Sequence, residues 1–233
     1  MPRLARVVAV EIPHHVTQRG NARRFIMDTD ADRTVYLNLL SQDIEFRGVS
    51  LVGYCLMSNH VHLVAIPHKA DELSQALRHT HGRYASYWNA AHQSSGHVWQ
   101  GRYYSCPLDR PHMWRALRYT ELNPVRAGLV LQAKLWKWSS AAAHCGVVGG
   151  ADCLADDPWG GHWTSEAWGE YLATGETESE IAEIRRCTHT GRPLGSEDFV
   201  HSLEHSMNRR LTPLKGGRPK RSILDASQGK LDL

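Results

Sequence analysis

The stretch that decides the fold runs from Tyr54 to Pro67 and reads Tyr-Cys-Leu-Met-Ser-Asn-His-Val-His-Leu-Val-Ala-Ile-Pro. Apolar residues lie on both sides of the Ser-Asn pair at 58–59, so the pattern predicts two strands joined by a tight turn. His60 and His62 open the second strand. Because side chains alternate across a strand, both imidazoles leave from one face, about 6.6 Å apart at the backbone, where they can share one divalent cation. Such pairs also line half-buried strands without any ligand, so a third ligand and a reacting group are needed elsewhere.

Length and composition describe an ordinary globular protein of 233 residues, 42% hydrophobic and 22% charged. No apolar run reaches the roughly 18 residues of a membrane span, and the start shows no signal-like core, so we expect a cytoplasmic protein without membrane contact. The five cysteines form no Cys-x-x-Cys pair, which argues against a disulfide framework and a zinc finger. The net charge of +3 is small. Arginines cluster near the start, around residues 102–126 and in residues 215–221, which is compatible with a phosphate backbone as partner.

The residues before the histidine pair predict strand, helix and strand. β-Branched residues predict a first sheet strand over His14 to Arg19. A helix is predicted from Asp28 to Arg47, with Asp30 as the capping residue and Gly48 as the stop. The next strand, Val49 to Met57, runs into the turn.

The residues after the histidine pair predict a second helix from Asp71 to about Ala91 and a further strand over His97 to Leu108. A third helix begins at Asp109 and must end near Asn123, because proline disfavours a helical conformation in the residue before it. Residues 129–138 read as one more extended piece.

Tyr119 and Asn123 lie four residues apart in the third helix, so they share one face with Cβ atoms about 5 to 6 Å apart. The plain alternative is that Tyr119 is a core residue and Asn123 a helix-terminal cap. Tyr103 and Tyr104 are rival candidates for tyrosine chemistry.

A composition shift places a soft domain boundary near residue 150, with a helical extension over 151–233. One helix begins at Thr177, where Glu180 completes a capping box, and another begins at Ser196. The extension, with its basic end at 215–221 and a tail expected to be mobile, fits a nucleic-acid-binding appendage or a helical hairpin packed on the main domain.

Four short motifs follow one another over roughly residues 4 to 145. They read His-Val-Thr-Gln-Arg-Gly-Asn over 15–21, His-Val-His over 60–62, Val-Trp-Gln-Gly-Arg over 98–102 and Tyr-Thr-Glu-Leu-Asn-Pro-Val-Arg-Ala over 119–127. Together they resemble the single-tyrosine HUH transposases, and within that family most closely the REP-associated tyrosine transposases.

The resemblance implies an α+β domain over residues 1–150, with a ferredoxin- or RRM-like central antiparallel sheet and packed helices. It also implies cleavage and rejoining of single-stranded DNA through a covalent 5′-phosphotyrosine. Tyr119 then is the nucleophile, His60 and His62 are metal ligands, and Asn123 is the third ligand, where many relatives carry Gln. The implied partner is single-stranded or hairpin DNA, with repetitive palindromic elements as the expected source. Whether the chain acts as a monomer or a homodimer is left open by the sequence.

These residue types suit that chemistry. A cation held against a non-bridging phosphate oxygen offsets charge in the transition state, and mixed nitrogen and oxygen ligation suits Mn²⁺ or Mg²⁺. Single-stranded DNA is bound by basic grooves with aromatic stacking and by sheet edges. The residues predicted to contact it are Gln18, Arg19, Arg23, Arg102, Arg118 and Arg126.

Two rival functions stay open at this point. The first is a domesticated binding protein that holds hairpin nucleic acid without cleaving it. The second is a zinc hydrolase that uses His60 and His62 with another histidine or a carboxylate.

Overall fold

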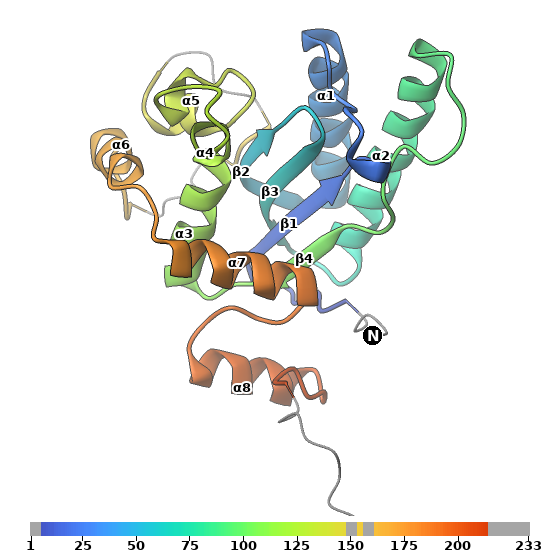
Figure 1. Cartoon of the computed structure of the whole chain (residues 1–233). Coiled ribbons are helices and arrows are strands. Elements are labelled where there is room, and N and C mark those ends of the chain that lie inside the picture. The colour runs from blue at the N-terminus through green and yellow to red at the C-terminus, as the bar shows by residue number, and fades with distance from the viewer. Residues whose placement is uncertain (1–5, 148–152, 156–160, 214–233) are drawn as a thin grey trace, which may run out of the picture.

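The computed structural model describes residues 6–147, 153–155 and 161–213. At its centre lies a four-stranded antiparallel sheet with the strand order β2-β3-β1-β4 (Figure 1). This arrangement confirms the predicted α+β fold. The strands are β1 (His14–Arg19), β2 (Val49–Leu56), β3 (His60–Pro67) and β4 (Tyr104–Pro107).

The order of elements along the chain is β1-α1-β2-β3-α2-β4, with β3 inserted between β1 and β2 and with β1 between β3 and β4. Two such split βαβ units make a ferredoxin-like sheet. The helices α1 (Asp30–Arg47) and α2 (Glu72–Ala91) pack on the same face of that sheet (Figure 1). The other face is therefore left for the elements that follow.

Alternation along β3 decides which side chains meet these helices. Val61 and Leu63 are buried in one core with Tyr36 and Leu40 of α1. Burying an aliphatic side chain of this size stabilises the fold by about 1.5–3 kcal/mol, so the register of β3 is strongly specified. The histidines at alternate positions of β3 consequently lie on the opposite face.

Helix α1 begins with a capping box at Thr29, whose side chain accepts the backbone N–H of Asp32 while the Asp32 carboxylate accepts that of Thr29. The prediction of Asp30 as the cap is therefore wrong. Asp30 is the first helical residue, and its carboxylate instead accepts hydrogen bonds from Lys137 and Trp138. The predicted stop at Gly48 is confirmed, because this residue has the left-handed conformation (φ 62°) that favours glycine.

Helices α3 (Arg110–Glu121) and α7 (Glu178–Thr190) cover the second face of the sheet (Figure 1). α3 approaches β2 very closely at Gly53. A Cβ atom there would lie 2.2 Å from Cδ1 of Leu117, which is fully buried, so any larger residue would push α3 away from the sheet.

The ends of α3 follow the sequence with one difference. Asp109 caps its start as predicted and accepts the backbone N–H of His112 at 2.9 Å. The helix ends at Glu121, two residues before the expected position, and Asn123 opens a separate short helix, α4 (Asn123–Arg126). Pro124 is tolerated there because the first turn of a helix needs no proline N–H.

Two predicted extended segments are shorter or differently built. Of the strand expected over 97–108 only β4 forms, and Trp99 makes a single bridge to Gly20. Its indole packs instead against His81 of α2 and donates to the carbonyl of that residue at 2.8 Å. In place of the extended piece at 129–138 the structure has a short 3-10 helix, Ala133–Leu135, followed by α5 (Ala141–His144); another 3-10 turn covers Asn21–Arg23.

The C-terminal extension contributes α6 (Ser165–Ala173), α7 and α8 (Glu197–Ser206). The predicted starts are confirmed: Thr177 and Glu180 form the capping box of α7, and Ser196 caps α8. α6 was not predicted. The expected boundary near residue 150 and the basic end at 215–221 lie outside the described residues.

The extension shares its hydrophobic core with the sheet domain. Trp168 of α6 and Ile184 of α7 are fully buried in one cluster with Val64 of β3 and Leu117 of α3. α8 packs separately, with Leu203 against Val7 and Ala9. None of the helices in the described ranges has the length and apolar composition needed to cross a membrane.

Candidate active site

The two histidines of β3 and the tyrosine of α3 converge on the second face of the sheet. His62 pairs with Thr17 of β1 and with Cys55 of β2. The ring of Tyr119 lies 5.5 Å from the ring of His62, centroid to centroid, and the rings of His60 and His62 are 5.0 Å apart. The structure thus brings together three of the predicted site residues, on the face covered by α3 and α7.

Both imidazoles of this pair are neutral and turned by partners behind them. Nδ1 of His60 lies 2.6 Å from the side-chain oxygen of Asn59. An oxygen of this kind only accepts, so Nδ1 donates the hydrogen bond and Nε2 keeps its lone pair. Burial lowers the pKa of His60 to about 4, the charge of Arg19 lowers it further, and the Asn123 amide opposes the shift. Burial also lowers the pKa of His62 well below its ordinary value, with the neighbouring His60 as the next cause. Neutral imidazoles are the form that binds a metal.

A third histidine, which the sequence reasoning did not single out, completes the group. His15 lies on β1, beside β3, and its ring stacks on that of His62 with centroids 5.2 Å apart. Its Nε2 is 3.0 Å from Nδ1 of His62, and its Nδ1 is 2.7 Å from the hydroxyl of Thr188 on α7. His15 opens the first motif of the sequence, and its place two residues before Thr17 puts it on the histidine face once the β1–β3 register is known.

Tyr119 is held from three sides and is only 4% exposed. The edge of its ring meets His15, and the guanidinium of Arg126 lies over the ring, 4.1 Å from its centroid. Nε of Arg185 on α7 donates to the Tyr119 hydroxyl at 3.2 Å. Arg185 thus places a charged donor at the oxygen that would attack a phosphate.

The predicted phosphate-binding residues Arg118 and Arg126 lie in ion pairs with the extension. Arg126 pairs with Glu176, whose side chain is 2% exposed, and donates to the backbone carbonyl of Tyr119 at 2.7 Å. Arg118 donates to Glu180 at 2.8 Å and to Thr174 at 3.2 Å.

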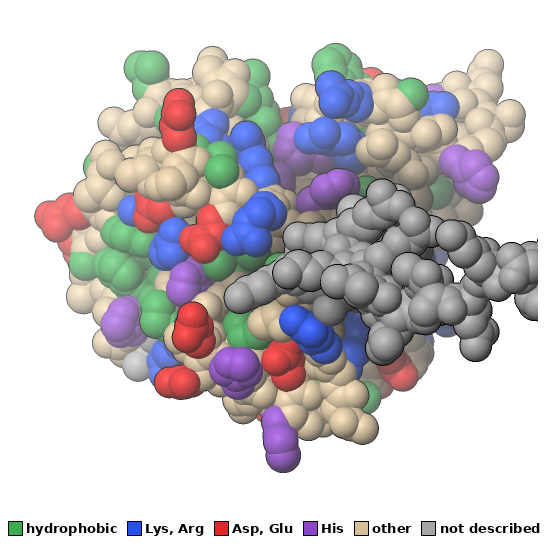
Figure 2. Space-filling model, turned by 60° about the horizontal axis from the view of Figure 1, so that its bottom comes forward, with side chains coloured by type: hydrophobic (Ala, Val, Ile, Leu, Met, Phe, Trp, Pro, Cys, Tyr) green, Lys and Arg blue, Asp and Glu red, His purple; other side chains and the backbone are tan. Residues whose placement is uncertain are grey.

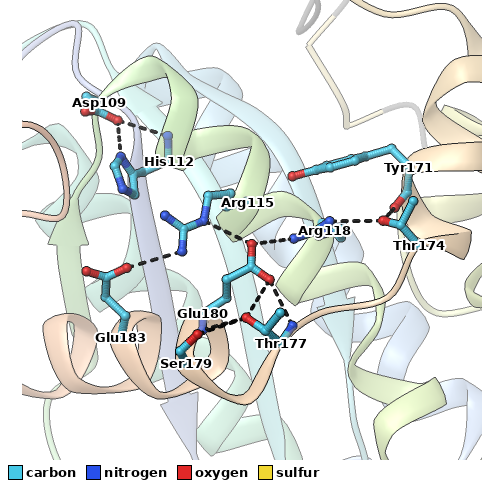
Figure 3. A network of polar contacts seen from close by, with 10 residues as sticks. All are labelled: Asp109, His112, Arg115, Arg118, Tyr171, Thr174, Thr177, Ser179, Glu180 and Glu183. Atoms are coloured by element: carbon cyan, nitrogen blue, oxygen red, sulfur yellow. Dashed lines mark hydrogen bonds and ion pairs between the residues drawn. The ribbon is translucent and has the colours of Figure 1, made fainter.

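Figure 3 shows how α3 and the start of α7 are joined. Arg115, one turn before Arg118, lies 3.5 Å from the same carboxylate of Glu180 and 3.2 Å from that of Glu183. This network uses the arginine charges to fix α3 against α7, which favours a structural role for Arg118 over a phosphate contact.

The other predicted DNA contacts lie near the rim. Arg19, Arg23 and Arg102 are exposed, whereas Gln18 is 3% exposed and donates to the carbonyl of Gly101 at 2.7 Å. Gln18 and Arg102 line a cavity of about 600 Å³ together with Arg6, Arg78, Trp99 and Tyr103. Lys and Arg side chains also gather along a hollow that contains His side chains (Figure 2).

A metal would find two imidazoles and one amide here. The Asn123 side chain interacts with His60, and its amide oxygen together with the two imidazole nitrogens suits a hard divalent ion that accepts nitrogen and oxygen ligands. In the described ranges no group of three or more His, Cys, Asp or Glu side chains could hold a metal ion. His15 is the third histidine of this group, but its Nε2 contacts His62 and its Nδ1 contacts Thr188, so both of its ring nitrogens already have partners.

One comparison with a solved structure agrees with this fold. A solved structure described as the REP-associated tyrosine transposase bound to a REP hairpin is similar to 66% of this chain and 94% of its own, with a TM-score of 0.54 and 16% identity. A putative transposase from Deinococcus radiodurans covers 51% of this chain and 95% of its own, with 15% identity and a TM-score of 0.36. No curated protein matches the sequence.

The sequence itself matches a family described as "Transposase IS200 like" over residues 9–123. That range begins before β1 and ends at Asn123, so it includes the sheet, both histidines of β3 and the tyrosine of α3. Over residues 9–123 the chain therefore belongs to the IS200-like transposase family.

Proposed function

We propose that this transposase cleaves and rejoins single-stranded DNA by attack of Tyr119 on a phosphodiester bond, with a covalent 5′-phosphotyrosine as intermediate. The observation that carries the proposal is the convergence of the Tyr119 hydroxyl, the two β3 histidines and Arg185 on one face of the sheet. The ester keeps the phosphate reactive, so a free 3′ hydroxyl can reverse the step without another energy source.

His60, His62 and the Asn123 oxygen would hold a divalent ion, Mg²⁺ or Mn²⁺. When bound, such an ion offsets negative charge on the phosphate. Asn59 and the hydrogen bonds behind His62 keep both imidazoles turned, and burial lowers the pKa of both so that they stay unprotonated. Arg185 stabilises charge on the attacking oxygen.

The scissile phosphate must reach a tyrosine that is 4% exposed. His60 is more exposed than His62, and Arg185, which contacts the Tyr119 hydroxyl, is an exposed residue. We therefore expect DNA to enter past His60 and to shift Arg185 from the hydroxyl toward the phosphate, which carries the larger charge.

Arg19, Arg23 and Arg102, with Gln18, remain our candidates for DNA contact. All three arginines are exposed, whereas Arg126 is held by a glutamate. A solved relative is described as bound to a REP hairpin. We extend this to the present chain as a proposal: hairpin-containing single-stranded DNA is its substrate.

The test is incubation of the full chain with end-labelled single-stranded hairpin DNA and Mn²⁺, followed by denaturing electrophoresis. Wild-type protein should form a covalent adduct, and Tyr119→Phe should form none while it still shifts the hairpin on a native gel. His62→Ala should lose cleavage but keep most of the binding.

The alternative is a non-cleaving DNA-binding protein, which the buried position of Tyr119 favours. In that case the wild-type chain shifts the hairpin and gives no adduct with any divalent ion, and the proposed chemistry is refuted.

A further inference from the structure

A chain of hydrogen bonds leads away from His62 through the protein to the extension. Nδ1 of His62 contacts Nε2 of His15 at 3.0 Å, and Nδ1 of His15 contacts the Thr188 hydroxyl at 2.7 Å. That hydroxyl is 3.3 Å from the sulfur of Cys106 on β4. All four side chains are at most 5% exposed, so water does not compete for these contacts.

The direction of this chain decides what His62 can bind. When Nδ1 of His62 donates to His15, His15 must donate to Thr188 and Thr188 to the sulfur, and Nε2 of His62 keeps its lone pair. The reverse direction places a proton on Nε2 of His62 and removes that lone pair. Burial raises the pKa of the Cys106 thiol to about 12, so the end of the chain stays a neutral group.

Thr188 departs from the usual behaviour of a helical threonine. Such hydroxyls commonly bond back to a carbonyl one turn earlier, as Thr190 does on the same helix with Arg186 at 2.8 Å. Thr188 is 2% exposed and turns its hydroxyl to His15 and Cys106 instead. The Thr188 hydroxyl therefore forms its hydrogen bonds with His15 and Cys106 and none with its own helix backbone.

We infer that Thr188, through His15, fixes the orientation of the His62 ring and determines which of its nitrogens carries the proton. Helix α7 of the extension therefore contributes to metal binding through Thr188. This rests on the proposed function, since it takes His62 as a metal ligand. His15 and Thr188 are positioning residues. Partners behind a metal-bound histidine typically change metal affinity about 10–100-fold when they are removed. The family match ends at residue 123, so Thr188 is a contribution from outside the matched region.

The experiment measures the dissociation constant for Mn²⁺ with the full chain and no DNA, from the electron paramagnetic resonance signal of free Mn²⁺. Thr188→Val removes the hydroxyl at nearly constant shape and should weaken Mn²⁺ binding about tenfold or more. Thr188→Ser keeps the hydroxyl and should restore binding to within about twofold. Thr190→Val is the matched control on the same helix and should bind like wild type.

A second readout does not use the metal. In ¹⁵N spectra of the histidine side chains, His62 should carry its proton on Nδ1 in the wild type and in Thr188→Ser, and a mixture of both forms in Thr188→Val. Thermal unfolding of each variant shows that the compared proteins are folded.

The outcomes separate this inference from the proposed function. If wild type binds no Mn²⁺, or binds it equally after His62→Ala, the metal site itself is refuted. If His62→Ala abolishes binding while Thr188→Val binds like wild type with an unchanged His62 proton, the metal site stands and the role of Thr188 is refuted.

Discussion

Arg126 offers the sharpest test of how the nucleophile is held, because its guanidinium makes three different contacts. It lies over the Tyr119 ring at 4.1 Å, donates to the Tyr119 carbonyl at 2.7 Å and pairs with Glu176. Arg126→Leu removes all three contacts. It also leaves the Glu176 carboxylate, 2% exposed, without its cation.

The expected loss follows from these contacts. A cation over an aromatic ring is worth about 0.5–2 kcal/mol, and a charged hydrogen bond about 1.5–3 kcal/mol. Removing one partner of a buried pair costs about 3–5 kcal/mol, and because these terms overlap we expect Arg126→Leu to lower the free energy of unfolding by ~3–5 kcal/mol. In Arg126→Leu/Glu176→Leu no unpaired charge remains, so the loss should fall to ~1–2 kcal/mol.

The pH dependence of Arg126→Leu has a definite sign. Burial raises the pKa of Glu176, and Arg126 opposes that shift. Without the arginine the pKa rises further. A carboxyl with a raised folded-state pKa favours the fold when protonated, so the single variant should regain stability as the pH falls from 7 toward about 5.

Urea unfolding of wild type, both single variants and the double variant at pH 7 and pH 5 gives these free energies. A loss below about 1 kcal/mol in Arg126→Leu, together with weaker DNA binding and a smaller salt dependence, would refute the reasoning. Arg126 would then be the phosphate contact that the sequence indicated.

Three further outcomes are expected. Glu121 is fully buried and accepts from Ser140 at 2.6 Å, His144 at 2.5 Å and Trp168 at 2.8 Å, so Glu121→Ala should cost ~3–5 kcal/mol in urea unfolding. Glu170→Ala changes an exposed glutamate and is the control. An equal loss of unfolding free energy in both variants would contradict a stabilising role of the buried carboxylate. Burial lowers the pKa of His81 to about 3. Between pH 6.5 and pH 4 the unfolded chain therefore binds a proton at this residue that the native chain does not bind. The free energy of unfolding should fall on acidification by about 1.4 kcal/mol per pH unit because of His81. His81→Gln should flatten the curve of unfolding free energy against pH by that amount, and an unchanged slope would argue against a neutral buried imidazole. Arg185→Met removes the donor to Tyr119 and should slow adduct formation about 10–100-fold in single turnover, corresponding to about 1.5–3 kcal/mol. Arg186→Met, at an exposed position of the same helix, is the control and should leave the rate of adduct formation unchanged. Equal rates for both variants would exclude a role of Arg185 in the attack.

Much of the fold follows from local rules. Alternation in β3 put both histidines on one face, and Gly48, Asp109 and the Thr177 capping box marked helix ends that the structure has. The failure at Asp30 shows the limit of such rules, because Thr29 and Asp30 are both capping types and only the capping box with Asp32 decides between them.

The site was less accessible to sequence reasoning. The approach of Tyr119 to His62 depends on how α3 packs on the sheet, and the resemblance to a family anticipated it where spacing alone did not. His15 needed the β1–β3 register. The ion pairs of Arg118 and Arg126 join residues 50 or more positions apart, which no local pattern reveals.

The extension was the part that local patterns described least. Its helix starts were predictable, but its packing was not: α7 lies on the histidine face and brings Arg185 and Thr188 to the site. A hydroxyl or an exposed arginine on a helix has no distinctive spacing, so only the tertiary arrangement identifies these residues.

The most direct measurement is mass spectrometry of the protease-digested product formed with single-stranded hairpin DNA and Mn²⁺. We predict that the peptide containing Tyr119 carries the mass of a nucleotide linked through a 5′ phosphate. Attachment at Tyr103 or Tyr104, or cleaved DNA with no nucleotide on any peptide, would contradict the assignment of Tyr119 as the attacking residue.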